Sequence, residues 1–240
     1  MIVNACLRNG RGGSPTAVLP DDDFSESERR AMPERYGTSH VVFVGPRGSL
    51  RFFTSEGELP GCGHGTVAAL AVLGGGEHTL RAGGRTFSGS AVEVPGGVEA
   101  VFDPGPVQVR PATTAERDAV VSALGAGGSC VIATLGRPRM LVEVTDVAGL
   151  APDFRLLRAA TDSLGLLGCY AYRAGERFAA RMFAPSIGVP EDIANANSTA
   201  CLAAHLGADI TVDMGDSLGR PATIVATAAG RVGGIAVVTA

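Results

Sequence analysis

The sequence predicts an α+β chain made of two similar halves, each with short strands arranged around one apolar helix. The 240 residues include 34 glycines, which suit tight turns between short strands. Two apolar segments, 66–74 and 199–207, carry Thr, Ala, Leu and Gly at the same four places, as expected for a structural repeat. Between them, the Pro- and Gly-containing run 103–106 separates two domains, 1–105 and 106–240.

The elements of the first half follow from its turn and capping residues. Ser25 and Glu28 form a capping box, which predicts a helix over 26–36. A second, apolar helix is predicted over 66–73 and ends at Gly74. Runs of β-branched and aromatic residues predict strands over 1–7, 16–19, 41–44 and 50–54, with further strand-like pieces up to 102.

The second half repeats this organisation. Thr113 caps a helix that ends near Gly125, and Asp153 caps a helix that runs to about Leu164. After a loop, an apolar helix is predicted over 198–206. The loop covers 184–197, and the predicted strands cover 131–134, 140–144, 169–172, 178–183 and a hairpin over 223–240.

The charged residues exclude several classes of protein. The chain contains no lysine, and all 20 basic residues are arginine. A pyridoxal-phosphate enzyme needs a lysine for its Schiff base, and a P-loop needs its Gly-Lys pair, so both are excluded. The net charge is −4 and no basic stripe is visible, so no nucleic-acid partner is expected. The expected partner is a small molecule.

The cysteines and the apolar runs bear on location. The cysteines are odd in number, and no apolar run of signal-peptide length precedes them. The longest apolar run, 67–73, is too short to span a bilayer, so no membrane contact is expected. The sequence therefore predicts a cytoplasmic protein with five free thiols, at Cys6, Cys62, Cys130, Cys169 and Cys201.

The run Gly61-Cys62-Gly63-His64-Gly65, just before the first apolar helix, is the strongest candidate site. A two-fold repeat would put two helix N-termini face to face across a cleft. Free N–H groups and the helix dipole favour a carboxylate there, and they also favour a thiolate at Cys62. The glycines allow close approach of a ligand to the backbone, and His64 is expected to point into the same cleft. Glycines on both sides make Cys62 hard to explain as a core residue.

Cys201 is open to two interpretations. It lies within the second apolar helix, where a small buried thiol is ordinary. If it instead faces Cys62, the two thiols would stand on opposite sides of one carbon, as a cofactor-free two-base racemase requires. The Thr-on-Thr and Cys-on-Cys alignments of the two helices place Cys201 differently. Cys6, Cys130 and Cys169 are flanked by strand residues and are expected in the core.

Zinc is a weaker alternative. Cys62, His64, Cys201 and His205 could supply four ligands, with the second pair one helical turn apart. The spacing contains no Cys-x-x-Cys and no His-x3-His pair, so neither a metal nor a cofactor is expected.

Several motifs together resemble the PhzF (phenazine-biosynthesis isomerase) family over nearly the whole chain. They agree in order and spacing, and they lie at 12–18, 36–44, 58–66, 152–155, 181–185 and 190–192. The resemblance implies the diaminopimelate-epimerase-like fold, in which two pseudo-symmetric domains each wrap a β-sheet round a central helix and the active site lies between them. It also implies a possible homodimer.

The departures from that family are informative. His40 stands where the family has its acid/base glutamate, and Cys62-Gly63-His64-Gly65 replaces Ala-Gly-His-Pro. The Cys-Gly-His-Gly string is similar to that of proline racemases, and Cys201 falls where diaminopimelate epimerases have their second cysteine. The loop 192–197 also differs from the family's Asp-Pro-x-Thr-Gly-Ser.

A narrower resemblance is to the PhzF-like isomerases of 4-alkyl-L-proline units in lincomycin and pyrrolobenzodiazepine antibiotic biosynthesis. It implies a cofactor-independent shift of a proton and a double bond in an unsaturated pyrroline carboxylic acid. The alternatives are a racemase or epimerase that uses both cysteines, and a non-catalytic binding protein. The expected catalytic residues are His40, Cys62, His64, Asp192 and Cys201, and the expected substrate-binding residues are Ser14, Gly63, Gly65, Thr66, Asn195, Asn197 and Ser198.

Overall fold

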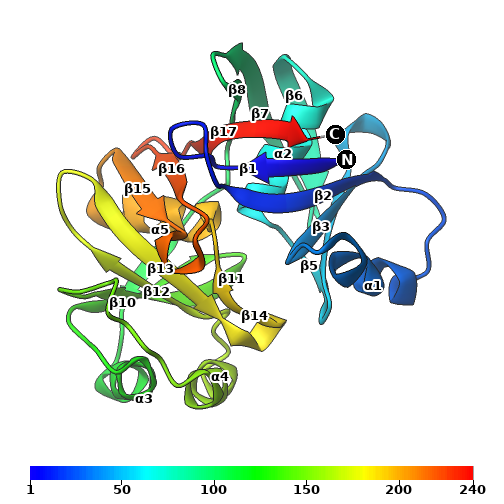
Figure 1. The fold of residues 1–240 in the computed structure, drawn as a ribbon. Coiled ribbons are helices and arrows are strands. Elements are labelled where there is room, and N and C mark those ends of the chain that lie inside the picture. The colour runs from blue at the N-terminus through cyan, green and yellow to red at the C-terminus, as the bar shows by residue number, and fades with distance from the viewer. Residues whose placement is uncertain (240) are drawn as a thin grey trace.

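Figure 1 shows a computed structural model of the chain, which describes residues 1–239. The first half begins with two strands, a crossover helix and two further strands, and its central helix follows. Its elements are β1 (Ile2–Ala5), β2 (Ser14–Pro20), α1 (Glu26–Tyr36), β3 (His40–Val44), β4 (Leu50–Thr54), β5 (Gly57–Leu59), α2 (Gly63–Leu73), β6 (Gly76–Ala82), β7 (Arg85–Val94) and β8 (Gly97–Phe102).

The second half has the same order of elements after one additional strand and one additional helix, β9 and α3. Its elements are β9 (Gln108–Pro111), α3 (Thr114–Leu124), β10 (Cys130–Leu135), β11 (Arg137–Glu143), α4 (Phe154–Ser163), β12 (Cys169–Arg173), β13 (Phe178–Ala184), β14 (Val189–Asp192), α5 (Ala196–Leu206), β15 (Ile210–Met214), β16 (Ala222–Ala226) and β17 (Val232–Thr239). Short 3-10 turns lie at Pro46–Gly48, Pro185–Ile187 and Asp216–Leu218.

The two halves share a topology. In the first, β2 and β3 are parallel neighbours joined by α1, and in the second β11 and β12 are parallel neighbours joined by α4. A parallel pair needs such a crossover, whereas most of the remaining pairs are antiparallel and can use short turns. The predicted pair of pseudo-symmetric α+β halves is therefore confirmed.

A central helix lies inside each half. The helix α2 packs mainly against the central strands of its sheet, β1, β2, β8 and β17, and α5 packs against β10, β11 and β16. Every residue of α2 from Gly63 to Ala71 is buried. A helix that is apolar on all sides must be enclosed in this way, which explains its run of Ala, Leu and Val. In Figure 1, α1, α3 and α4 lie on the outside.

The last strand connects the halves. As predicted, β16 and β17 form a hairpin at the C-terminus. Beyond it, β17 pairs with β8 and β1 of the first half, with Gly234 opposite Ala100 and Thr239 opposite Ile2. Residues 232–239 thus complete the first sheet although they follow the boundary at 105, and Ala240 lies outside the described residues.

Helix boundaries differ from the predicted ones mainly at the site. The central helices begin at Gly63 and Ala196, a few residues before the predicted starts at 66 and 198, because burial between the halves compensates for the low helix propensity of glycine and asparagine. The helices over 26–36, 114–124 and 154–163 agree with their predicted caps at Ser25, Thr113 and Asp153. Over residues 1–239, no helix has the length and apolar character needed to cross a membrane.

Candidate active site

The N-termini of α2 and α5 meet at the boundary between the halves. A Cβ added to Gly63 would lie 2.7 Å from Ala196 Cβ and 2.9 Å from the backbone nitrogen of Asn197. Only glycine permits this contact, because real Cβ atoms do not approach other atoms so closely. The predicted face-to-face arrangement of two helix starts is therefore confirmed.

The two helix starts are in the same register. Cys62 and Asn195 occupy the N-cap positions. The Thr66 hydroxyl donates to the Cys62 carbonyl over 2.8 Å, and Thr199 donates to the Asn195 carbonyl over 3.0 Å. The Thr-on-Thr alignment is therefore the structural one, and it matches Cys62 with Asn195 rather than with Cys201.

The caps of the two helices differ chemically. The Asn195 side chain accepts from the backbone N–H of Ser198 over 2.9 Å, whereas Cys62 makes no side-chain cap hydrogen bond. The first N–H groups of a helix have no partner within it, so the start of α2 offers unpaired donors together with the positive end of the helix dipole. An anion is the natural ligand for that position.

A cavity of about 140 Å³ opens at these helix starts and is lined by both halves. The predicted catalytic residues that line it are His40, Cys62, His64 and Asp192. The predicted binding residues that line it are Gly63, Thr66, Asn195 and Asn197. The structure therefore brings together residues that are far apart in the sequence, as the resemblance implied.

Four predicted site residues do not line the cavity. Cys201 is fully buried one turn further along α5, and burial raises the pKa of its thiol. Gly65 packs against the Phe52 ring within α2's first turn, while Ser198 and Ser14 are buried without reaching the cavity. Their prediction followed sequence position alone, which does not fix the direction in which each side chain points.

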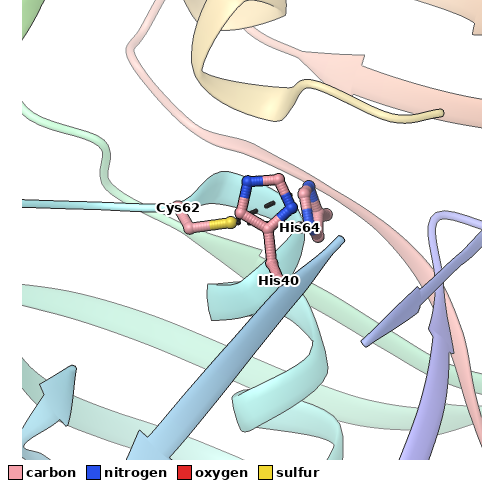
Figure 2. Close-up of side chains that lie close together, drawn as sticks. All are labelled: His40, Cys62 and His64. Atoms are coloured by element: carbon pink, nitrogen blue, oxygen red, sulfur yellow. Dashed lines mark hydrogen bonds between the residues drawn. The ribbon is translucent and has the colours of Figure 1, made fainter. Parts of the chain in front are cut away.

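Cys62, His64 and His40 lie together beside the start of α2 (Figure 2). The Cys62 Sγ is 3.5 Å from His64 Nε2, and His64 Nδ1 is 2.8 Å from the Ala194 carbonyl oxygen. Because a carbonyl only accepts, Nδ1 is the donor, which leaves Nε2 to exchange a proton with the thiol. The ring centroids of His40 and His64 are 4.5 Å apart at a near-perpendicular angle.

The charge on His64 is set by its neighbours. Burial disfavours the imidazolium, but the interactions with Cys62 and Asp192 outweigh burial and raise the pKa of His64 to about 10. Asp192 Oδ2 is 3.9 Å from His64 Nδ1 and accepts a hydrogen bond from Asn195 Nδ2 over 2.9 Å. At neutral pH, His64 is thus a cation that faces a sulfur atom.

The pKa values of His40 and Asp192 are also shifted, in opposite directions. Burial, together with the charge of His64, lowers the pKa of His40 well below its usual value, so His40 is neutral. Burial raises the pKa of Asp192 despite the nearby His64 charge. Asp192 Oδ1 is buried and has no hydrogen-bond partner among residues 1–239. Asp192 Oδ1 therefore remains available to a polar ligand in the cavity.

The structure does not bring the four predicted zinc ligands together. Neither Cys201 nor His205 lies with Cys62 and His64, and the metal-type donor atoms that do gather within 4.8 Å of one another belong to His40, Cys62 and His64. The four-ligand set predicted from sequence spacing is therefore not assembled.

Sequence reasoning missed the arginines of the cavity. Arg85, Arg137 and Arg139 line it together with Asp103. Because every basic residue of the chain is arginine, arginine content alone could not single them out. The alternation Arg137-Pro138-Arg139 was the available signal, since residues two apart on a strand share a face.

Comparisons with known proteins agree with this architecture. The chain is 30% identical over 254 residues to the trans-2,3-dihydro-3-hydroxyanthranilate isomerase of Pseudomonas chlororaphis, covering 96% of this chain and 90% of the relative. It is 28% identical to the "Uncharacterized isomerase YddE" of Escherichia coli O157:H7, covering 82% of this chain and 74% of the relative. The PhzF-family phenazine biosynthesis protein of Bacillus anthracis has the same fold, with a TM-score of 0.79, 16% identity, and coverage of 98% and 95% of the two chains.

The sequence model of the phenazine biosynthesis-like protein family matches residues 4–238, which is nearly the whole described chain. The Pseudomonas and Escherichia relatives are both named as isomerases, and the cavity with its acid/base side chains lies between two pseudo-symmetric halves. This chain therefore belongs to the phenazine biosynthesis-like (PhzC-PhzF) family and is an isomerase of the diaminopimelate-epimerase-like fold.

Proposed function

We propose that this isomerase shifts a proton and a double bond in a small unsaturated cyclic amino acid of the pyrroline carboxylate type, without a cofactor. The observation that carries the proposal is the pair of Cys62 Sγ and His64 Nε2, 3.5 Å apart at the uncapped start of α2. A thiol and an imidazole in contact form an acid/base pair, and the adjacent N–H groups suit a carboxylate.

The proposed reaction conserves all atoms. The Cys62 thiolate takes a proton from a carbon beside the double bond, the electron pair moves along the allylic system, and a proton returns at its far end. His64, as a cation, stabilises the thiolate before the transfer. Neutral His40 can accept or return a proton, and Asp192 stabilises the protonated form of His64. Backbone around Gly63 and Asn197 borders the substrate in the cavity.

The dimensions of the cavity support a substrate with one ring. Its volume is about 140 Å³, and an engineered apolar cavity of about 150 Å³ binds benzene. The Pseudomonas relative's name describes a partly reduced, one-ring amino acid. The proposal that this chain acts on a 4-alkylproline precursor in cytoplasmic antibiotic biosynthesis rests on the narrower sequence resemblance.

The main alternative is an amino-acid racemase or epimerase with two catalytic thiols. It requires Cys201 on the far side of the substrate carbon from Cys62. Cys201 is buried in the interior of α5 and corresponds to Ala68 in the repeat, which favours transfer by Cys62 and the histidines instead.

An NMR assay in D₂O distinguishes these activities. The purified chain is incubated with a 4-alkylidene pyrroline carboxylate, L-proline, 4-hydroxyproline and diaminopimelate. We expect deuterium at a ring or side-chain carbon of the pyrroline, with a moved double bond. Deuterium only at Cα would contradict the proposal and support the racemase, and exchange in none of these compounds would favour a binding protein.

Matched cysteine variants test the role of the thiol. We expect Cys62→Ser to lose at least about a hundredfold in rate, the scale of general acid/base catalysis, while remaining folded. Cys130→Ser changes a half-buried thiol outside the cavity and serves as the control. Full activity of Cys62→Ser would contradict the assigned role.

A further inference from the structure

Two arginines of β11 stand on one face of the strand and line the cavity. Arg137 and Arg139 are two residues apart, which puts their side chains on the same side of the sheet. Both contribute to the cavity that also contains Cys62 and His64. Two cations therefore face the same small volume as the acid/base pair.

Neither arginine has a counter-ion among the described residues. Among residues 1–239, no carboxylate forms an ion pair with either guanidinium, although ten other pairs are present. Arg139 is only 1% exposed, and its Nε has no hydrogen-bond partner. An unpaired buried cation is unfavourable, so its retention at a cavity wall points to an anion that arrives from outside.

Hydrogen bonds fix the position of the Arg139 guanidinium. Its Nη2 donates to the carbonyls of Leu135 and Arg137 over 2.8 and 2.9 Å, and its Nη1 donates to Ser198 Oγ over 3.3 Å. Ser198 lies in the first turn of α5, so the guanidinium sits beside the positive end of that helix. The cation and the helix start reinforce each other's attraction for the same anion.

A purely structural role does not account for both arginines. Arg139 does close the turn between β10 and β11 through its two carbonyl contacts. The Arg137 guanidinium, by contrast, makes no hydrogen bond to any described residue, and the side chain is only half-buried. Arg137 is therefore free to bind a ligand in the cavity.

We propose that Arg137 and Arg139 form an anion subsite that binds the substrate's carboxylate and selects carboxylates over uncharged analogues. The inference rests on the proposed function and assigns the carboxylate to the wall made by β11 and α5. A charge-assisted pair with a carboxylate is stronger than a neutral hydrogen bond, and arginine can make two parallel bonds to it. The uncapped start of α2 then remains beside the reacting part of the ring.

Protection of Cys62 from alkylation tests the subsite without requiring turnover. The full chain is treated with iodoacetamide, and labelling of the Cys62 peptide is followed by mass spectrometry. The ligands are pyrrole-2-carboxylate and its carboxamide, two flat rings that differ in charge. We expect protection by the carboxylate and at least about tenfold weaker protection by the carboxamide, because charged hydrogen bonds contribute about 1.5–3 kcal/mol.

Two variants assign the selectivity to Arg137. In Arg137→Gln, we expect protection by the carboxylate to require at least about tenfold more ligand. Arg173→Gln removes an exposed arginine outside the cavity. This control variant should bind the carboxylate as tightly as the unmodified chain does. With a substrate in hand, Arg137→Gln should raise KM more than it lowers kcat.

The outcomes separate this inference from the proposed function. Equal protection by the two ligands, no protection by the carboxylate, or unchanged binding in Arg137→Gln would each overturn the subsite, even if the D₂O assay showed a double-bond shift. Selective protection that Arg137→Gln abolishes would support the subsite even if the pyrroline showed no exchange.

Discussion

Among single residues, His64 has a charge state that depends on two partners contributed by different halves. The side chain of Cys62 precedes it on the same loop, and the carboxyl group of Asp192 comes from β14. Their combined charge overcomes burial and keeps His64 protonated at neutral pH, whereas His40, 4.5 Å away between centroids, is kept neutral. Two identical side chains in contact thus differ by one proton.

This difference has a consequence for stability. The pKa of His64 is raised in the folded protein from 6.5 to about 10, so protonation of His64 stabilises the fold fully below pH 6.5, and the stabilisation is lost as the pH rises toward 10. We expect the free energy of unfolding to fall between pH 6.5 and about 8, below the pH at which the thiol of Cys6, with an unfolded pKa of 9.0, titrates in the unfolded chain.

Urea unfolding of the unmodified chain and of His64→Gln at several pH values checks this dependence. The variant should show a flatter profile over the same interval. His78→Gln is the matched control, because His78 bonds the Gly74 carbonyl and stands apart from the cavity. A profile of His64→Gln as steep as that of the unmodified chain would contradict the assigned charge of His64.

Among the elements, the contact between α2 and α5 is the tightest constraint on the site. Gly63 allows the two helix starts to meet, and a methyl group there would overlap Ala196 and Asn197. We expect Gly63→Ala to lower the free energy of unfolding by about 1–3 kcal/mol, the usual effect of overpacking, and to reduce activity by separating the halves.

Gly61→Ala provides the control for that substitution. An added Cβ at Gly61 meets no atom within 4 Å, and the position belongs to the same loop. Thermal unfolding and the D₂O assay measure both variants. Equal effects of the two substitutions would show that stability and activity depend on backbone flexibility of the loop rather than on the contact between α2 and α5.

The elements were also the most predictable part of the molecule. Helices α1, α3 and α4 carry their start signals in Ser25, Thr113 and Asp153, and local capping chemistry is readable from sequence. The starts of α2 and α5 were less readable, because glycine and asparagine become helical there only through burial. The orientation of Cys201 and of Arg139 depends on helix register and strand face across two halves, which no local pattern records.

For the whole molecule, β17 makes the two halves one folding unit. It pairs with β16 of the second half and with β8 and β1 of the first. We expect a single cooperative thermal transition, because loss of either sheet removes a paired edge from the other. Differential scanning calorimetry should give equal calorimetric and van't Hoff enthalpies, and two resolved transitions would contradict this coupling.

The pairing of Ile2 with Thr239 also has a consequence for synthesis on the ribosome. The sheet around α2, which carries Cys62 and His64, lacks a central strand until residues 232–239 have emerged. The sheet of the N-terminal half therefore stays incomplete while the second half is translated. Such long-range pairing is slow to form, since the entropy of closing a very large loop must be overcome first. The active site is therefore expected to form only after β17 has been synthesised, although Cys62 and His64 are made much earlier.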